Sequence, residues 1–185
     1  PTGYGDSPYQ CFSAFAGNPL LISPDRLVAD GYLPAKAIEV VPDFPTSKVD
    51  FGPVIEYKHS LMRQSYEYFK ANGDKSQHEA YNQFCRNTAY WLDDFALFMA
   101  LKEYHKDQDG GVWNTWPKAI AKRQVRAMKQ WTKQLAEEID LHKFQQFLFF
   151  KQWLELKAYA NGRGIRIIGD NPIFVAYDSA DVWAH

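Results

Sequence analysis

The stretch NGRGIRIIGD, residues 161–170, decides how the chain is expected to fold. Its glycines favour the end of a helix, because glycine adopts the left-handed backbone of a helix terminus without steric cost. Ile165–Ile168 is a short apolar run that predicts a buried strand, and Asp170 follows it in a polar loop. A helix, a glycine turn, a strand and a carboxylate in this order predict one step of an α/β fold. Functional residues of such folds gather at the carboxyl ends of strands, which makes Asp170 a candidate site residue.

The residues before this stretch are predicted to be mostly helical. Ser23 caps a short helix that ends at Gly31, and apolar residues at helical spacing predict a longer helix over about 53–71. The sequence SQHE at 76–79 has the pattern of a capping box for a third helix that ends near residue 105. The apolar side of the 53–71 helix is predicted to comprise Leu61, Met62, Ser65, Tyr66 and Phe69.

Two further helices are expected in the second half of the chain. Pro117 begins a basic helix through about Lys129, and a longer helix covers about 135–161. Phe147–Phe150 is an unbroken apolar run, so side chains of this helix point in every direction and must be buried on most sides. The chain is therefore expected to be predominantly helical.

Composition limits the classes of function. The 185 residues are 46% hydrophobic and 16% aromatic, which is typical of a globular protein. The net charge of −1 gives no overall attraction to nucleic acid or to an anionic membrane. Cys11 and Cys85 are too few for a disulfide framework and favour a reducing, cytoplasmic location. No stretch has the apolar length of a membrane span, and the chain is expected to be a piece of a larger protein.

Two polar, aromatic segments are the best candidates to carry function. PTGYGDSPYQC covers residues 1–11, and GDNPIFVAYDSADVW covers residues 169–183. Asp, Ser and Tyr supply hydrogen bonds and flat apolar faces, which suits the binding of a polyol. The alternative is structural: tyrosines pack within loops, and Asp6 and Ser7 bond to their own backbone. Asp178 and Asp181 with Ser179 have the pattern of a capped helix start.

Other clusters of chemical groups have simpler interpretations. Asp93 and Asp94 are adjacent on a helix, so their side chains diverge and cannot flank one bond. Glu138 and His142 have the i,i+4 spacing of metal ligands, but no second pair of ligands stands nearby. We expect a helix-surface interaction there and no metal site.

Residues 118–133 contain six basic residues and no acidic one. A basic amphipathic helix can lie on RNA, on an anionic membrane or on a partner protein. The competing interpretation is a solvated helix face, which the near-zero net charge favours.

Four blocks of sequence resemble the 4-α-glucanotransferases, also called amylomaltases or disproportionating enzymes, which are relatives of α-amylase. The blocks are GYGDSPYQ (3–10), FAGNPLLISPDRL (15–27), WLDDFALFMALKE (91–103) and IRIIGDNPIFVAYDSADVW (165–183). The resemblance implies a fragment of a (β/α)8 barrel with a large, mostly helical insertion. Residues 1–24 would form a barrel loop, 25–134 the insertion, and 135–185 a barrel helix, strand and active-site loop.

The resemblance also implies the chemistry. Family members transfer segments of α-1,4-glucans between maltooligosaccharides by a retaining double displacement, in which an Asp attacks the anomeric carbon and a Glu protonates the leaving oxygen. Both groups are expected beyond residue 185, so this chain alone would be inactive. No metal or organic cofactor is implied, and the expected partners are glucans, not nucleic acid or membrane. The alternative is a non-catalytic glucan-binding module.

The resemblance implies roles for individual residues. Tyr9 and Ser7 match positions that contact the donor sugar near the cleavage point, and Asp170 matches a supporting carboxylate. Tyr4 and Phe51 match an outer aromatic platform for a long glucan, where the family often has tyrosine at the position of Phe51. No catalytic residue is expected within the chain.

Overall fold

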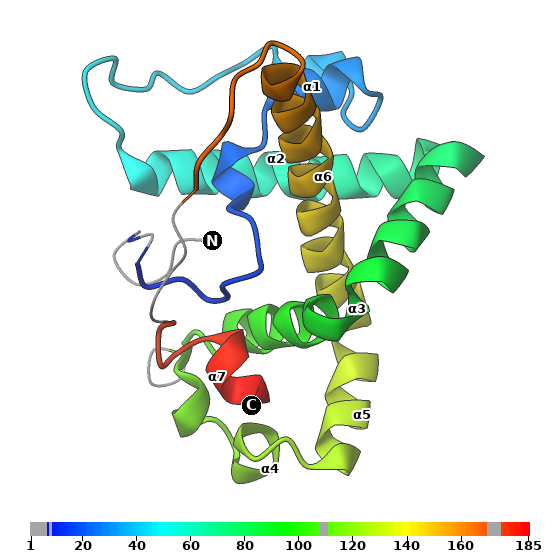
Figure 1. Cartoon of the computed structure of the whole chain (residues 1–185). Helices are drawn as coiled ribbons and strands as arrows, with labels where there is room; N and C mark the ends of the chain where they lie inside the picture. The colour runs from blue at the N-terminus through cyan, green and yellow to red at the C-terminus, as the bar shows by residue number, and fades with distance from the viewer. Residues whose placement is uncertain (1–6, 8, 108–110, 170–174) are drawn as a thin grey trace. The chain divides into compact units, whose positions relative to one another are not determined.

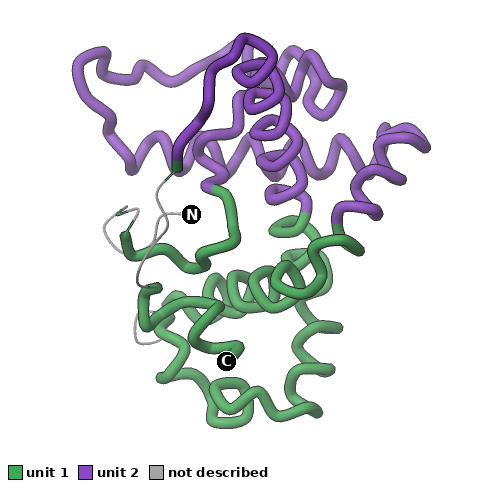
Figure 2. The backbone as a smooth tube through the Cα atoms, viewed as in Figure 1, with its two compact units in different colours: residues 1–17, 85–143, 169–185 green, residues 18–84, 144–168 purple. Residues whose placement is uncertain are grey.

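The computed structural model describes residues 7, 9–107, 111–169 and 175–185 (Figure 1). Helices dominate these residues, and no strand occurs among them. Contacts divide the chain into two compact units (Figure 2). Unit 1 comprises residues 1–17, 85–143 and 169–185, and unit 2 comprises residues 18–84 and 144–168.

Unit 2 confirms the predicted helices of the first half of the chain. Its own elements are η2 (Pro19–Leu21), α1 (Pro24–Ala29), η3 (Ala35–Ile38) and α2 (Phe51–Asn72), with residues 75–84 of α3 (Lys75–Tyr104) and 144–161 of α6 (Ala136–Asn161). The hydroxyl of Ser23 accepts the N–H of Arg26 at 3.3 Å and so caps α1, as predicted. The buried residues of α2 are the five that its helical spacing predicted.

An aromatic cluster around Phe144 forms the core of unit 2. Phe144 is fully buried, and its ring stacks on Phe69 with 4.8 Å between centroids. Tyr66 and Tyr32 contact the same ring at 5.6 and 6.1 Å. The hydroxyl of Ser65 donates to the carbonyl of Tyr32 at 2.8 Å, so this polar group is satisfied inside the core. The apolar part of the helix predicted around Phe147 is therefore buried, because this helix, α6, contributes Phe144 to the centre of the cluster.

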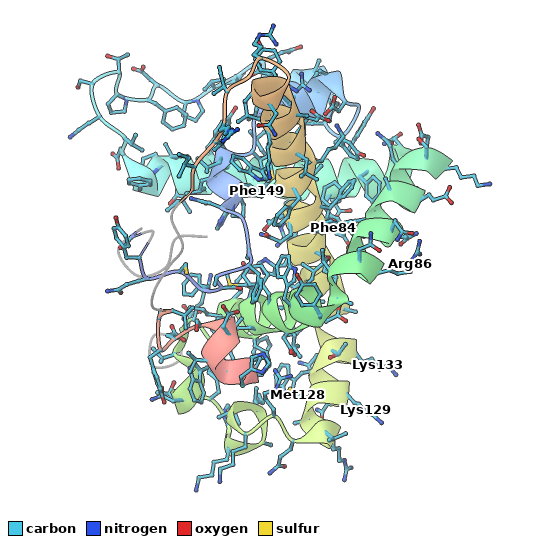
Figure 3. The ribbon with its side chains drawn as sticks, in the orientation of Figure 1. Phe84, Arg86, Met128, Lys129, Lys133 and Phe149 are labelled. Atoms are coloured by element: carbon cyan, nitrogen blue, oxygen red, sulfur yellow. The ribbon has the colours of Figure 1, made fainter. Side chains whose placement is uncertain are left out.

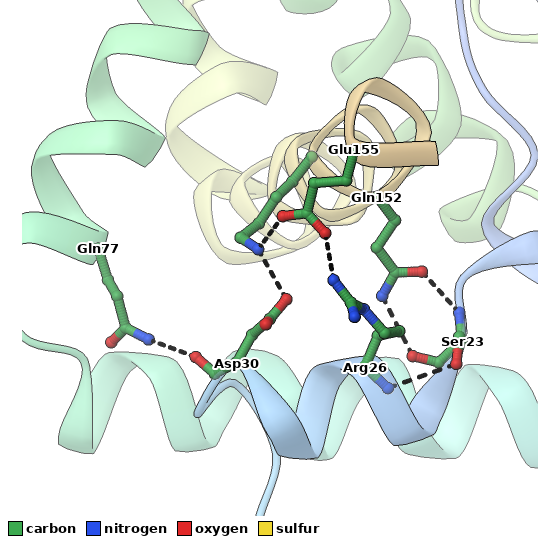
Figure 4. Close-up of polar contacts among 7 residues, drawn as sticks. Ser23, Arg26, Asp30, Gln77, Gln152 and Glu155 are labelled. Atoms are coloured by element: carbon green, nitrogen blue, oxygen red, sulfur yellow. Dashed lines mark hydrogen bonds and ion pairs between the residues drawn. The ribbon is translucent and has the colours of Figure 1, made fainter. Parts of the chain in front are cut away.

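A charged network links α1 to α6 within unit 2 (Figure 4). The Nζ of Lys151 lies 2.6 Å from Asp30 Oδ2 and 2.6 Å from Glu155 Oε1, and Arg26 donates to Glu155 at 2.6 Å. Hydrogen bonds from Lys151 and then Arg26 lower the pKa of Glu155. Partial burial opposes the charge of Lys151, but its bonds to Asp30 and Glu155 outweigh burial and raise its pKa. The network therefore holds α1 against α6 with its members charged at neutral pH.

The cap of α3 differs from the prediction. The capping box is formed by Asp74 and Gln77, not by residues 76–79: Asp74 Oδ1 accepts the N–H of Gln77 at 2.9 Å, and Gln77 Oε1 accepts the N–H of Asp74 at 3.0 Å. These bonds, led by the Gln77 N–H and followed by the Ser76 hydroxyl, lower the pKa of Asp74. Because α2 ends at Asn72 with Gly73 as its C-cap, Asp74 is the first residue available to cap the next helix.

Unit 1 shows a second difference. Besides residues 85–104 of α3 and 136–143 of α6, it contains η5 (Trp113–Thr115), α4 (Lys118–Ala121), α5 (Val125–Gln134) and α7 (Ala180–Ala184). The single basic helix expected from Pro117 is wrong, because the backbone breaks at Arg123 with φ of 49°. The guanidinium of Arg123 bonds to Asp94 at 2.6 Å and lies 4.3 Å from the ring of Trp183. Long-range contacts thus accompany a backbone conformation that local sequence disfavours.

The core of unit 1 is built around Phe98, which is fully buried on α3. Trp116 and Trp183 contact its ring at 5.5 and 5.9 Å between centroids, and Phe12 lies at 6.3 Å. The indole N–H of Trp183 donates to the carbonyl of Ile120 at 3.3 Å. Residues from both ends of the chain therefore share one core with α3.

The buried strand predicted at 165–168 is wrong for the described residues. The segment is extended coil, and Ile165 and Ile168 are 57% and 93% exposed. A strand needs a neighbour to pair its backbone groups, and no strand occurs elsewhere in the described ranges. The preceding turn is as predicted: α6 ends at Asn161, and Gly164 has φ of 73°.

Candidate functional site

The two polar, aromatic segments meet in unit 1. The N–H of Ala180 donates to the carbonyl of Phe12 at 2.8 Å. The carboxylate of Asp181 accepts the hydroxyl of Ser13 at 2.8 Å and the N–H of Ala14 at 2.7 Å. These bonds join segments that lie at opposite ends of the sequence, and they place residues 9–12 beside residues 175–178. Ser179 caps α7, as predicted, by accepting the N–H of Val182 at 3.2 Å.

A cavity of about 480 Å³ lies where the segments meet. Tyr9 and Tyr177 are its most exposed aromatic side chains, at 75% and 60%. Tyr9 is the one predicted site residue among the described lining residues, because the approach of the others depends on hydrogen bonds between distant segments. The cavity is lined by Tyr9, Gln10, Phe12, Val175, Ala176, Tyr177 and Asp178.

The charge of Asp178 is compensated. Its carboxylate forms an ion pair with Lys102 and accepts the backbone N–H of Trp113 at 3.3 Å. The Nζ of Lys102 also lies 5.1 Å from the centroid of the Phe12 ring. No other carboxylate belongs to the described lining residues. The described lining residues can therefore bind through aromatic faces and neutral polar groups, and none of them is a free acid or base for bond cleavage.

The predicted site residues have different outcomes. Tyr9 lines the cavity, and its backbone N–H donates to the hydroxyl of Ser7 at 3.3 Å, so Ser7 supports the turn that presents the ring. Phe51 is the first residue of α2 in unit 2 and is 42% exposed. It is not among the described lining residues of the cavity. Tyr4 and Asp170 lie outside the described residues.

The adjacent carboxylates on α3 are structural. Asp94 pairs with Arg123 at 2.6 Å, and Asp93 forms an ion pair with Lys143. The two carboxylates therefore have separate ion-pair partners, in line with the prediction that their side chains diverge on the helix.

The pair Glu138 and His142 is not a simple surface pair. His142 is only 5% exposed, and its Nε2 lies 3.3 Å from Oε1 of Glu103, which comes from α3. Helix packing buries the histidine, which the i,i+4 spacing could not show. Within the described ranges, no group of three or more His, Cys, Asp or Glu side chains could hold a metal ion.

The basic segment presents an exposed surface on α4 and α5. Arg126, Lys129 and Lys133 have the i, i+3 and i+7 spacing of one helix face. Figure 3 shows Lys129 and Lys133 projecting from α5. Arg123 does not belong to this surface, since its guanidinium bonds to Asp94 and lies over the ring of Trp183. No described helix has both the length and the apolarity required to cross a membrane.

A larger hollow of about 770 Å³ lies in unit 2 between α1 and α6. Its walls are mainly apolar, with Phe149, Trp153 and Tyr159 among them. The side chain of Gln152 is hydrogen-bonded to the backbone of Ser23 at 2.8 and 3.1 Å. The two charged residues that line the hollow, Arg26 and Glu155, form an ion pair with each other (Figure 4). None of its described lining residues is a predicted site residue, and none is an unpaired acid or base that points to catalysis.

Comparison with known proteins defines the class. The whole chain, residues 1–185, matches the family described as 4-alpha-glucanotransferase. It is similar to the 4-alpha-glucanotransferases of Thermus thermophilus, with 49% identity over 186 residues, and of Synechocystis sp., with 47% identity over 185 residues. The fold is similar to an amylomaltase from Streptococcus agalactiae in complex with acarbose, with a TM-score of 0.90, 36% sequence identity and 99% of this chain covered.

The chain belongs to the 4-alpha-glucanotransferase family. It spans 36% of the length of each of these three proteins, although the match covers all or nearly all of the chain itself. The resemblance seen in the four sequence blocks is therefore confirmed.

Proposed function

We propose that the protein containing this chain is a 4-α-glucanotransferase that moves α-1,4-glucan segments between maltooligosaccharides. The observation that carries the proposal is the family match over residues 1–185, joined to a cavity that brings Tyr9 beside residues 175–178. A pyranose has an apolar CH face that packs on an aromatic ring, and the described lining of the cavity has no uncompensated charge. The amylomaltase of similar fold is in complex with acarbose, which makes that compound a suitable probe for the proposed site.

The proposed division of labour follows from these features. Tyr9 contacts the donor sugar, Ser7 supports its turn, Tyr4 and Phe51 form an outer platform, and Asp170 supports the reacting centre. The retaining double displacement needs a nucleophilic Asp and an acid/base Glu, which we assign to residues beyond 185. This assignment agrees with a cavity whose one described carboxylate is already paired.

We also infer that the chain is part of a (β/α)8 barrel with a helical insertion. Exposed Ile165 and Ile168 support this inference, because they would be buried if the segment paired with strands supplied by further sequence. The apolar hollow beside Phe149 and Trp153 would likewise be covered by such sequence. The division into 1–24, 25–134 and 135–185 and the cytoplasmic location stay predictions. Cys11 and Cys85 form no disulfide within the described residues, which agrees with a reducing compartment.

Incubation of the full-length protein with pure maltotriose tests the proposal. Transfer gives glucose and a ladder of longer oligosaccharides on thin-layer chromatography, because the glucosyl-enzyme intermediate passes to a second glucan. Hydrolysis would give glucose and maltose without the ladder and would contradict the proposed transfer. Binding of maltooligosaccharides without any turnover would favour the glucan-binding module instead.

A further inference from the structure

Tyr177 is held in the cavity by Trp113, a residue from a different part of the chain. The two rings lie 5.2 Å apart between centroids, at 36° to each other. The indole N–H of Trp113 donates to the carbonyl of Tyr177 at 2.8 Å, and its backbone N–H donates to the next residue, Asp178. Tyr177 is thus fixed through both its ring and its main chain.

The turn that carries Trp113 is anchored in its own right. The Nζ of Lys102 donates to the carbonyl of Gly111 at 3.2 Å and pairs with Asp178. The indole N–H of the buried Trp116 donates to the same carbonyl at 3.2 Å. The support behind Tyr177 therefore reaches α3 and the core of unit 1, which is more than packing of a surface loop requires.

In spite of this support, Tyr177 is 60% exposed and lines the same cavity as Tyr9. Its hydroxyl has no hydrogen-bond partner among the residues that the structure describes. A rigid ring with a free hydroxyl can stack on a sugar and donate to it at a low cost in conformational entropy.

We propose that Tyr177, backed by Trp113, is a second sugar-stacking wall of the glucan site, next to the wall formed by Tyr9. The inference rests on the proposed function, because it takes an α-1,4-glucan as the ligand. It extends that function by assigning a binding role to Tyr177 and a positioning role to Trp113, neither of which the family resemblance supplied. Two aromatic faces in one cavity would bind neighbouring glucose units of the glucan.

Binding of acarbose to the full-length protein, followed by isothermal titration calorimetry, tests the proposal apart from catalysis. Tyr177→Ala is expected to weaken binding about tenfold, since one aromatic stacking contact is lost. Tyr177→Phe keeps the ring and is expected to stay within about threefold of the parent protein, the margin that one neutral hydrogen bond allows. Trp113→Phe keeps the aromatic contact but loses the bond to the Tyr177 carbonyl, so an intermediate loss is expected.

Tyr90→Ala is the matched control. Tyr90 is a 74% exposed tyrosine on α3 in the same unit, and it does not line the cavity. Unchanged binding in Tyr177→Ala, or an equal loss in Tyr90→Ala or Tyr177→Phe, would overturn the stacking role. Should Tyr177→Ala lower the melting temperature, Tyr177→Leu retains apolar contact with Trp113 without a flat ring, and the same tenfold loss is expected. Failure of the parent protein to disproportionate maltotriose would reject the proposed function. The acarbose titrations would still test whether Tyr177 stacks on a bound sugar.

Discussion

The proposed binding role of Tyr9 can be tested apart from the fold. Tyr9 is 75% exposed, so its removal leaves the core of unit 1 intact. We expect Tyr9→Ala in the full-length protein to lower kcat/KM for maltotriose. The expected loss corresponds to about 1–3 kcal/mol of stacking free energy, by analogy with base stacking. Steady-state assays of released glucose measure this change.

Tyr9→Phe is the control for that experiment, because it retains the stacking face. A melting temperature that falls with kcat/KM in Tyr9→Ala, or kinetics that do not change, would return Tyr9 to the structural interpretation of loop tyrosines.

Glu155 links residue chemistry to the pH dependence of stability. Its pKa is lowered in the folded state by Lys151 and Arg26, so its contribution is present above the ordinary glutamate pKa of 4.5 and is lost as pH falls through the lower folded value. We expect Glu155→Gln to cost about 0.5–1 kcal/mol at pH 7, a value reduced for the 40% exposure of the side chain. Thermal melting at pH 7 and below pH 4 measures the difference, which should shrink in acid.

Glu56→Gln is the matched control in the same unit, since Glu56 is exposed on α2 and its side chain has no hydrogen bond or ion pair among the described residues. An equal loss in Glu56→Gln, or a loss in Glu155→Gln that is the same at both pH values, would contradict the role of the network.

The helix ends make a prediction at the scale of elements. A Cβ added at Gly73 would lie 2.6 Å from the carbonyl oxygen of Phe69 and 2.8 Å from its ring, so the helix backbone would have to shift. At Gly164, φ is +73° but no atom lies within 4 Å, so alanine meets only backbone strain. We expect Gly73→Ala to cost about 2–3 kcal/mol and Gly164→Ala about 1 kcal/mol.

Melting temperatures of the two variants give the comparison. A larger loss in Gly164→Ala would show that positive φ, and not the clash at the end of α2, is the stronger constraint.

The basic face of α5 makes a prediction about function. Replacing Arg126, Lys129 and Lys133 by glutamine is expected to leave disproportionation of maltotriose within about twofold of the parent protein, because solvated charges contribute little to a neutral substrate. Salt-dependent retention of the parent protein and of this variant on a heparin column tests the alternative, in which the basic face binds a polyanion. Strong retention of the parent protein at physiological salt, abolished in the variant, would support a polyanion partner.

Elements defined by local pattern were predictable, and those that depend on distant residues were not. The buried face of α2 and the cap at Ser23 follow from spacing within one helix. The box predicted at 76–79 is wrong, because Asp74, directly after the C-cap of α2 at Gly73, caps α3 instead. The break at Arg123 depends on Asp94 and Trp183, whose positions no local pattern reveals.

At the scale of the whole chain, the two polar segments could be identified as candidates, but their meeting could not be worked out from spacing. Bonds from Ala180 and Asp181 to residues 12–14 bring them together over more than 160 positions of sequence. The contact with Trp113, which lies in a separate turn, is what makes Tyr177 a candidate site residue. The composition of the two segments therefore predicts the kind of ligand, and tertiary contacts determine which residues line the cavity.

The exposed apolar surface of unit 2 leads to a prediction about the chain by itself. Leu156 and Tyr159 line a hollow of about 770 Å³, and Ile168 is 93% exposed. If further barrel sequence covers these groups, residues 1–185 expressed alone should bind the dye ANS strongly, whereas the full-length protein should bind it weakly. The same fragment should release no glucose from maltotriose, because the proposed nucleophile and acid lie beyond it. Weak dye binding by a folded fragment, or transfer activity in it, would contradict the assignment of this chain as one part of a larger barrel.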